Sequence, residues 1–265
     1  MLKPSEVIPG PKGLVGGAPP QSNGVMLLLA GTGVTRNVRT LTLDSGSLGR
    51  VWPVSSSAVA IAQSNPDLVA VGLATTNTGA VEFARAASRR TVVATVPLGA
   101  PVRSVTAGAD GTTFYALNGN TESTTVSVVN SRNHTVVANV PVPLGALAAT
   151  PSANESSIYV LEPDGKVSEI QVATGKVLSA FDIGSDAMSL ALGPNGTTLY
   201  VLRDPGAISE VGVVNLTTES VERTLPAPLR CVAIELSPDG TSLYDIVGAA
   251  AYGNVQIYRL TATKS

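Results

Sequence analysis

The sequence contains few of the residues that carry nucleophilic or redox chemistry. It has one cysteine, Cys231, and one histidine, His134, in 265 residues. A single cysteine excludes an internal disulfide, and because Cys231 stands in an apolar run we interpret it as a small buried side chain. His134 lies in the polar segment NSRNHT, which predicts an exposed turn and disfavours a Ser-His-Asp or Cys-His arrangement. The sequence also lacks P-loop, CxxC and HExxH motifs, so we predict no catalytic residue and no resident cofactor.

Charged residues are scarce as well. They make up 14% of the chain, and the 17 basic and 19 acidic side chains nearly cancel, which leaves a net charge of −2. The sequence has no basic stripe, so we expect no nucleic-acid partner. Apolar runs such as residues 25–30 are far shorter than the roughly 20 residues that a membrane-spanning helix needs. We therefore expect no transmembrane segment.

What the sequence has instead is an internal repeat. One short segment recurs four times, as TTFYALNG at 112–119, SSIYVLEP at 156–163, TTLYVLRD at 197–204 and TSLYDIVG at 241–248. The tyrosines of these copies stand 44, 41 and 44 residues apart, a mean period of 43. Repeats of this length, each made of several short strands, are typical of β-propeller blades.

Each repeat contains four strand-like segments. An apolar run leads into an Asx-Gly turn, or Asn154-Glu155 in one copy, and the turn leads into the tyrosine segment. An alternating run and a fourth strand-like segment follow. Weaker copies precede residue 95, and dividing 265 residues by the period gives about six blades. We predict one all-β domain over residues 1–265, a monomeric six-bladed propeller of four-stranded antiparallel blades. The last repeat lacks its fourth strand, so we expect residues 1–10 to close the ring by pairing in the last blade.

The repeat resembles a known family. The segments GPNGTTLYVL (193–202), SPDGTSLYDI (237–246) and TVSVVNSRNHTVVANVPV (125–142) are similar to YVTN-type β-propeller repeats. The resemblance implies a cell-envelope or secreted protein, and related propellers include lactonases. We accordingly expect an extracellular, periplasmic or cell-envelope location, with a signal peptide already removed. Many relatives have seven blades, so a count of six departs from the family.

Four polar residues are candidate ligand contacts. Ligands of propellers usually bind at the loops that join an outer strand to the next inner strand, and three charged residues of these loops are Arg103, Asp186 and Arg230. Asp186 and Arg230 occupy equivalent repeat positions, so we expect them to face each other at the mouth of the central channel. The alternative is a solvated ion pair of little energetic worth. Glu235 lies in an inner strand. We interpret it either as a channel carboxylate that binds a ligand or as a paired structural glutamate.

Three functions remain open from the sequence. The first is a non-catalytic binding or interaction module, whose partner is an unknown protein or small molecule. The second is a metal-dependent, lactonase-like hydrolase with Ca²⁺ in the channel, for which Asp186 and Glu235 are too few ligands on their own. The third is a structural domain of a larger protein. Metal analysis of the purified protein would separate the first two.

Overall fold

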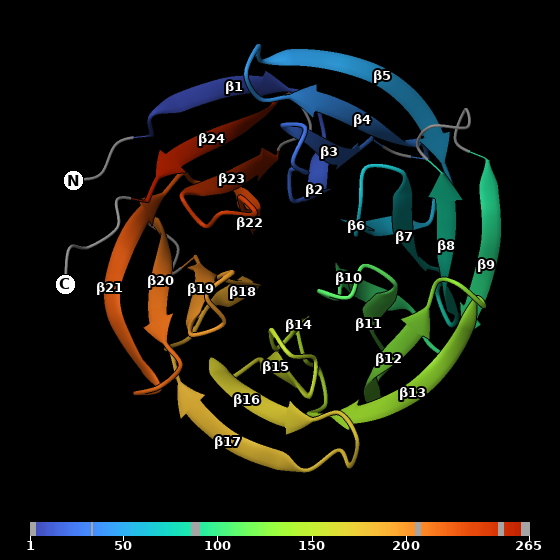
Figure 1. Ribbon diagram of the computed structural model, residues 1–265, viewed down its shortest axis with the longest axis vertical. Helices are drawn as coiled ribbons and strands as arrows, with labels where there is room; N and C mark the ends of the chain where they lie inside the picture. Colours follow the sequence, from blue (N-terminus) through green and yellow to red (C-terminus); the bar gives the residue numbers. More distant parts are fainter. Residues whose placement is uncertain (1–3, 33, 86–90, 205–207, 249–251, 261–265) are drawn as a thin grey trace. The chain divides into compact units, whose positions relative to one another are not determined.

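The chain folds into antiparallel β-sheets. The computed structural model describes residues 4–32, 34–85, 91–204, 208–248 and 252–260, and over this part of the chain it contains 24 strands and no helix. The strands form six four-stranded sheets, called blades here (Figure 1). The predicted fold, an all-β six-bladed propeller, is confirmed. The chain divides into two compact units, which are residues 1–53 with 187–265, and residues 54–186.

The first unit contains blades 1, 5 and 6. Blade 1 consists of β2 (Leu14–Ala18), β3 (Val25–Ala30), β4 (Arg36–Thr42) and β5 (Ser47–Val54). Blade 5 consists of β18 (Ala187–Leu192), β19 (Thr198–Arg203), β20 (Ser209–Asn215) and β21 (Ser220–Ala227). Blade 6 consists of β22 (Cys231–Leu236), β23 (Ser242–Gly248), β24 (Gly253–Arg259) and β1 (Glu6–Gly10).

The second unit contains blades 2, 3 and 4. Blade 2 consists of β6 (Ala58–Gln63), β7 (Leu68–Ala74), β8 (Gly79–Arg85) and β9 (Val92–Leu98). Blade 3 consists of β10 (Val102–Ala107), β11 (Thr113–Gly119), β12 (Thr124–Asn130) and β13 (Thr135–Val142). Blade 4 consists of β14 (Ala148–Pro151), β15 (Ser157–Leu161), β16 (Lys166–Gln171) and β17 (Val177–Asp182).

The N-terminal strand completes the last blade, as the repeat count predicts. β1 pairs antiparallel with β24 over five residues, from Glu6 opposite Ile257 to Gly10 opposite Gly253. Ile8 is only 2% exposed and packs in the apolar cluster between blades 6 and 1. A segment more than 240 residues away in sequence therefore supplies the outer strand that the last repeat lacks.

The turn between the first and second strands of a blade, called its first turn here, is held by an Asx side chain. Asp110 Oδ1 accepts hydrogen bonds from the backbone N–H groups of Thr112 (2.8 Å) and Thr113 (2.7 Å), and its Oδ2 accepts from both threonine hydroxyls. Burial acts to raise the pKa of Asp110, but these bonds outweigh it and lower the pKa to about 2. Asn195 accepts the same two backbone bonds in blade 5, and in blade 6 Asp239 accepts from the Thr241 N–H while Ser237 Oγ accepts from the Ser242 N–H. The repeated Asx positions thus fix the hairpins.

The residue after the Asx side chain adopts a left-handed backbone conformation in each of these turns. Gly111, Gly196 and Gly240 have φ near +70°, where glycine is favoured. In blade 4 the position is taken by Glu155, with φ 58°. The sequence predicts a turn at Asn154-Glu155, and the positive φ of Glu155 confirms it.

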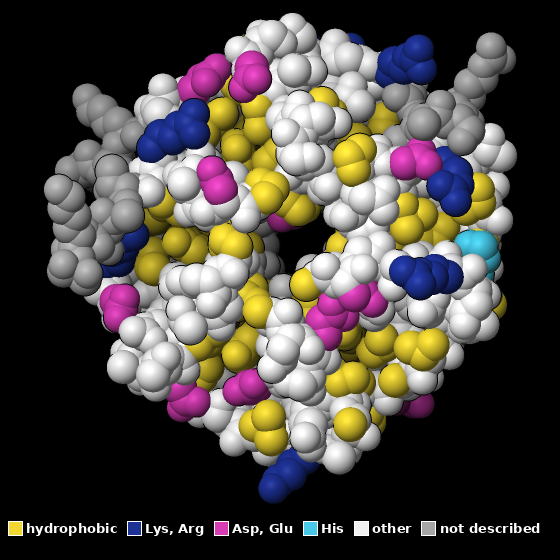
Figure 2. Space-filling model, viewed as in Figure 1, with side chains coloured by type: hydrophobic (Ala, Val, Ile, Leu, Met, Phe, Trp, Pro, Cys, Tyr) yellow, Lys and Arg dark blue, Asp and Glu magenta, His cyan; other side chains and the backbone are white. Residues whose placement is uncertain are grey.

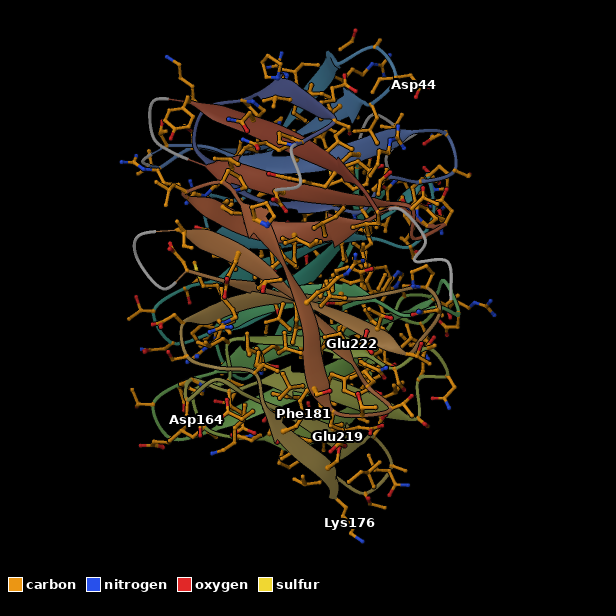
Figure 3. The ribbon with its side chains drawn as sticks, turned by 90° about the vertical axis from the view of Figure 1, so that its left-hand side faces the viewer. Asp44, Asp164, Lys176, Phe181, Glu219 and Glu222 are labelled. Carbon is orange, nitrogen blue, oxygen red and sulfur yellow. The ribbon has the colours of Figure 1, made fainter. Side chains whose placement is uncertain are left out.

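The core lies between neighbouring blades of each unit. The repeat tyrosines Tyr115, Tyr159, Tyr200 and Tyr244 are all buried, at 3–8% exposure. Outer strands are much more exposed, with only one face packed. In β17, Figure 3 shows Phe181 directed inward, whereas Lys176 extends from the preceding turn into solvent.

Candidate functional site

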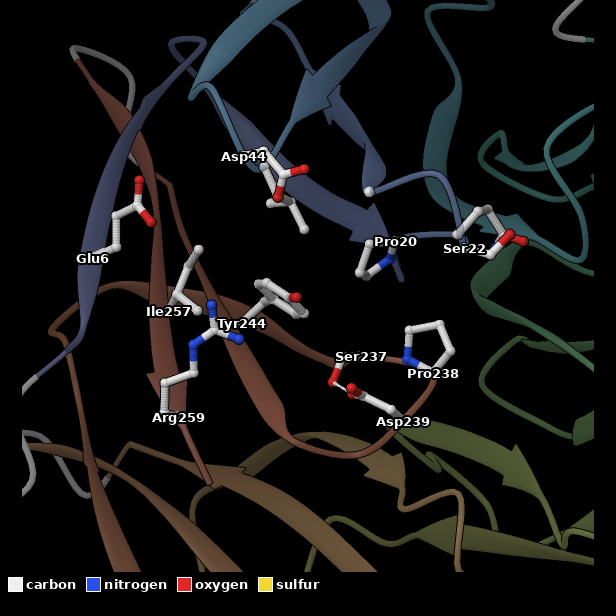
Figure 4. A pocket seen from close by; sticks show the side chains of 13 residues that line it. Glu6, Pro20, Ser22, Asp44, Ser237, Pro238, Asp239, Tyr244, Ile257 and Arg259 are labelled. Carbon is white, nitrogen blue, oxygen red and sulfur yellow. Dashed lines mark hydrogen bonds between the residues drawn. The ribbon is translucent and has the colours of Figure 1, made fainter. Parts of the chain in front are cut away.

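A pocket opens between blades 6 and 1 of the first unit. Its volume is about 520 Å³, within the range of small-molecule sites. Three turns and two strands of these blades contribute to it, together with β1 (Figure 4). The lining residues are Glu6, Pro20, Gln21, Ser22, Gly24, Leu43, Asp44, Ser237, Pro238, Asp239, Tyr244, Ile257 and Arg259.

The inner wall of the pocket is apolar with one phenol. Tyr244, Ile257 and Leu43 are 4–9% exposed and belong to the apolar cluster between the two blades. Burial raises the pKa of the Tyr244 hydroxyl, which therefore stays protonated and able to donate. Arg259 lies beside Tyr244 in Figure 4, and its Nη1 donates to Ser242 Oγ at 2.8 Å. The wall thus offers a flat aromatic surface next to an anchored guanidinium.

The rim of the pocket is acidic. Glu6, Asp44 and Asp239 are exposed carboxylates from three different segments, and Figure 4 shows them spread around the opening. Hydrogen bonds from the Ser237 hydroxyl (2.5 Å) and from Thr241 hold the pKa of Asp239 at about 2. With one guanidinium against three carboxylates, the lining carries net negative charge.

At one edge of the pocket, glycine stands where another blade has glutamate. In blade 4, Glu155 reaches back to blade 3, where its carboxylate accepts bonds from Tyr115 Oη (2.9 Å) and from the backbone N–H of Asp110 (2.8 Å). Gly24 is the equivalent residue of blade 1, since each closes its first turn by donating to the carbonyl three residues earlier. A Cβ on Gly24 would meet nothing nearer than Asp44 Oδ2, at 3.8 Å.

The junction between blades 5 and 6 is closed in a different way. There Pro194, in the first turn of blade 5, lies against Gly240, in the first turn of blade 6, and a Cβ on Gly240 would be 2.8 Å from the proline ring. No such contact forms at Gly24, whose surroundings include neither Pro238 nor its turn within 4 Å. Two junctions are therefore filled, one by a carboxylate and one by a proline, whereas the junction at Tyr244 is hollow.

The four residues predicted from the sequence lie elsewhere in the structure. Arg103 is on β10, and its Nη1 donates to the backbone carbonyl oxygens of Gly145 and Ala146, both at 3.1 Å. Its guanidinium thus joins blade 3 to the loop that begins blade 4. This contact gives Arg103 a structural task within the second unit.

Asp186 and Arg230 do occupy equivalent positions, each immediately before the inner strand of its blade. Their φ angles are 65° and 66°, and Gly13, before β2, has φ 65°. Both side chains are exposed, and Asp186 Oδ2 accepts a hydrogen bond from the Ser185 hydroxyl at 2.7 Å. Asp186 belongs to the second compact unit and Arg230 to the first. That they face each other remains a prediction.

Glu235 is crowded by protein but still reached by solvent. It lies on β22 opposite Tyr244 of β23, on the face of blade 6 that packs toward blade 1. Burial raises its pKa to about 8, although the residue keeps intermediate solvent exposure. Glu235 is adjacent to the pocket wall but does not line the pocket.

The structure adds one residue that the sequence analysis did not single out. Asp245 on β23 has no exposed surface, and neither carboxylate oxygen has a hydrogen-bond partner. Burial raises its pKa to about 8. The signal was present in the repeat, because the residue after the repeat tyrosine is Ala116, Val160 or Val201 in the other three strong copies.

No group of three or more His, Cys, Asp or Glu in a metal-binding arrangement occurs among the described residues. Nor does the described part of the chain contain a helix that is long and apolar enough to cross a membrane. On the face seen in Figure 2, charged side chains lie singly or in small groups, separated by uncharged surface.

No family model and no curated protein matches the sequence. Among solved structures, one chain titled hydrazine synthase from Kuenenia stuttgartiensis superposes with a TM-score of 0.70. The match covers 94% of this chain and 96% of that chain, at 12% sequence identity. A likeness at this identity shows the fold alone, which is the six-bladed propeller that the sheets define.

Proposed function

We propose that the protein is a non-catalytic binding module whose ligand occupies the pocket between blades 6 and 1. The observation that carries the proposal is the open junction at Gly24, in contrast to the junctions filled by Glu155 and Pro194. The acidic rim and the phenol favour a small ligand with a cationic amine or guanidinium on an apolar body. Carboxylates attract the cation, and the face of Tyr244 and the apolar wall accept the rest.

We further propose that the chain is a YVTN-type repeat propeller that works outside the cell or in the cell envelope, with a protein or small-molecule partner. The four tyrosine segments, and the Asx-Gly turns that precede three of them, support this assignment. The lactonase-like alternative depends on the same resemblance and would require Ca²⁺. Calcium titration followed by a lactone hydrolysis assay separates it from the binding module.

Filling the pocket tests the proposal. Gly24→Glu introduces a glutamate at the turn of blade 1 that is equivalent to the Glu155 turn of blade 4. There its side chain can reach Tyr244 and occupy the space proposed for the ligand. We expect primary amines of drug-fragment size, such as tyramine and agmatine, to bind the wild-type protein in calorimetric titration. Carboxylates of the same size should not bind. The amines should bind Gly24→Glu at least about tenfold more weakly, since the wall and rim become inaccessible.

Gly111→Glu is the matched control for this substitution. Gly111 has the same backbone conformation (φ 70°) and nothing within 4 Å of a Cβ, but it does not line the pocket. Both variants carry the same cost of a non-glycine residue at positive φ, about 1 kcal/mol. Equal amine affinity in wild type and Gly24→Glu would refute this pocket as the binding site.

A further inference from the structure

A second pocket lies in the other unit, between blades 2 and 3. It has a volume of about 400 Å³. Its lining comes from the β9–β10 and β11–β12 loops and from strands β9, β11, β12 and β13. The lining residues are Pro97, Leu98, Gly99, Ala100, Asn118, Asn120, Ser123, Thr125, Ser127, Val136 and Asn139. These described residues include no charged side chain. The pocket therefore suits a different class of ligand from the acidic pocket between blades 6 and 1.

A buried hydrogen-bond chain sets the direction of one amide at this pocket. Ser127 is 2% exposed, and its Oγ donates to Asn139 Oδ1 at 2.8 Å. Asn118 is 6% exposed, and with its amide nitrogen turned toward its acceptors it donates to Ser127 Oγ at 2.9 Å. The chain thus runs from Asn118 through Ser127 to the oxygen of Asn139. The Asn139 oxygen is thereby engaged, and its nitrogen carries two N–H donors.

A second amide is fixed in the same sense. Asn120 Oδ1 accepts hydrogen bonds from the backbone N–H groups of Glu122 (2.8 Å) and Ser123 (2.9 Å). Its carbonyl end is therefore engaged, and its NH₂ group has no bond within the described chain. Asn120 and Asn139 are exposed residues of the pocket lining whose oxygens are engaged, so their nitrogens together supply four N–H donors.

The rest of the lining matches this pattern. The hydroxyls of Ser123 and Thr125 can both donate and accept, and Leu98 and Val136 add small apolar surfaces. Blade 4 differs at the equivalent wall, where Glu162 accepts from Ser168 and Ala180 stands opposite Ser168. Blade 3 is therefore neutral where blade 4 is charged, and it has Asn139 where blade 4 has alanine.

We infer that this pocket binds a neutral saccharide. Sugar hydroxyls pair with preset amide donors and with serine and threonine hydroxyls, and the C–H faces of a sugar ring lie well against small apolar side chains. An uncharged lining offers no full opposite charge to a phosphate, carboxylate or amine group, so hydrogen bonding to neutral hydroxyls is favoured. The site is separate from the proposed amine pocket and does not depend on it.

Isosteric substitution tests the inference. Asn139→Asp and Asn120→Asp keep the acceptor oxygens that Ser127 and the loop backbone require, but each removes two N–H donors and adds a charge. The probes are cellobiose, maltotriose, lactose and di-N-acetylchitobiose, measured by saturation-transfer NMR and calorimetry. At least one should bind the wild-type protein, and each variant should weaken its binding about tenfold or more.

Asn133→Asp is the matched control. Asn133 lies in the β12–β13 turn, its Oδ1 accepts from Thr135 Oγ1 at 2.8 Å, and it does not line the pocket. This variant should keep wild-type sugar affinity, and melting temperatures confirm that all variants fold. Failure of every sugar to bind the folded wild-type protein would overturn the inference, as would binding that survives both pocket variants. Binding of an uncharged peptide in place of every sugar would also overturn it.

Discussion

The Asp245→Asn substitution should stabilise the protein more at pH 7 than at pH 3. The difference between its effects on the free energy of unfolding at these two pH values should be on the order of 4 kcal/mol. Asp245 is fully buried and unpartnered, and its pKa is raised from 3.8 to about 8. In the unfolded chain this carboxyl ionises near pH 4, whereas in the folded chain it stays protonated up to about pH 8. Between these values the folded state binds one more proton, so wild-type stability falls as pH rises.

The groups around Asp245 do not reverse this sign. Burial raises the pKa of the Cys231 thiol on β22 and raises the pKa of Tyr258 on β24 to about 12, and the charge of Asp245 adds to both shifts. Both groups therefore stay neutral through the window from pH 4 to 8. The measurement is urea unfolding at pH 3, 5, 7 and 8 for wild type and Asp245→Asn.

Glu235 supplies the control, because burial raises its pKa to about 8 on the opposite face of blade 6. Glu235→Gln should remove its own part of the pH dependence and leave that of Asp245. Asp245→Val, which restores the residue found in blades 4 and 5, should be at least as stable as Asp245→Asn. If wild type and Asp245→Asn showed parallel pH profiles, Asp245 would not be a protonated buried acid.

Removal of residues 1–10 is expected to destabilise the fold strongly. The truncation deletes β1, so the backbone of β24 loses five paired residues and its edge becomes exposed. It also removes Ile8 from the cluster that joins blades 6 and 1. Ile8→Ala alone should lower the free energy of unfolding by about 2–4 kcal/mol, and the truncation should cost more.

Val7→Ala is the control in the same strand, because Val7 is 51% exposed and Ile8 is 2% exposed. Val7→Ala should change the free energy of unfolding by no more than about 0.5 kcal/mol. Denaturant unfolding of the three variants gives the comparison. An unchanged midpoint for the truncated protein would contradict a stabilising role for β1.

The repeat made the fold predictable. Four copies of one strand-turn-strand pattern fixed the period, and the missing outer strand of the last copy pointed to residues 1–10, which β1 confirms. Cys231 is buried and His134 is an exposed turn residue with φ 57°, as predicted. These features follow from local sequence, since turn chemistry and strand alternation act over a few residues.

The pockets could not be predicted in the same way. The pocket between blades 6 and 1 is lined by Gly24, which has no side chain, and by Tyr244, and these two residues are 220 positions apart. The character of the pocket between blades 2 and 3 depends on which end of each asparagine amide is occupied, which only the hydrogen-bond network reveals. Asp245 is intermediate, because alignment of LYDI with LYVL would have marked it without showing that it lacks a partner.

The first-turn position gives the fold a simple means of diversification. Glutamate at this position fills the space beside a neighbouring blade's tyrosine, and glycine leaves that space to the adjoining turn, while the hairpin keeps its backbone conformation at Gly24 and at Glu155 alike. New recognition sites can therefore arise or disappear one junction at a time, without any change in the number, length or pairing of the strands. A repeat protein with this property can acquire a new ligand while its folding determinants stay under unchanged selection.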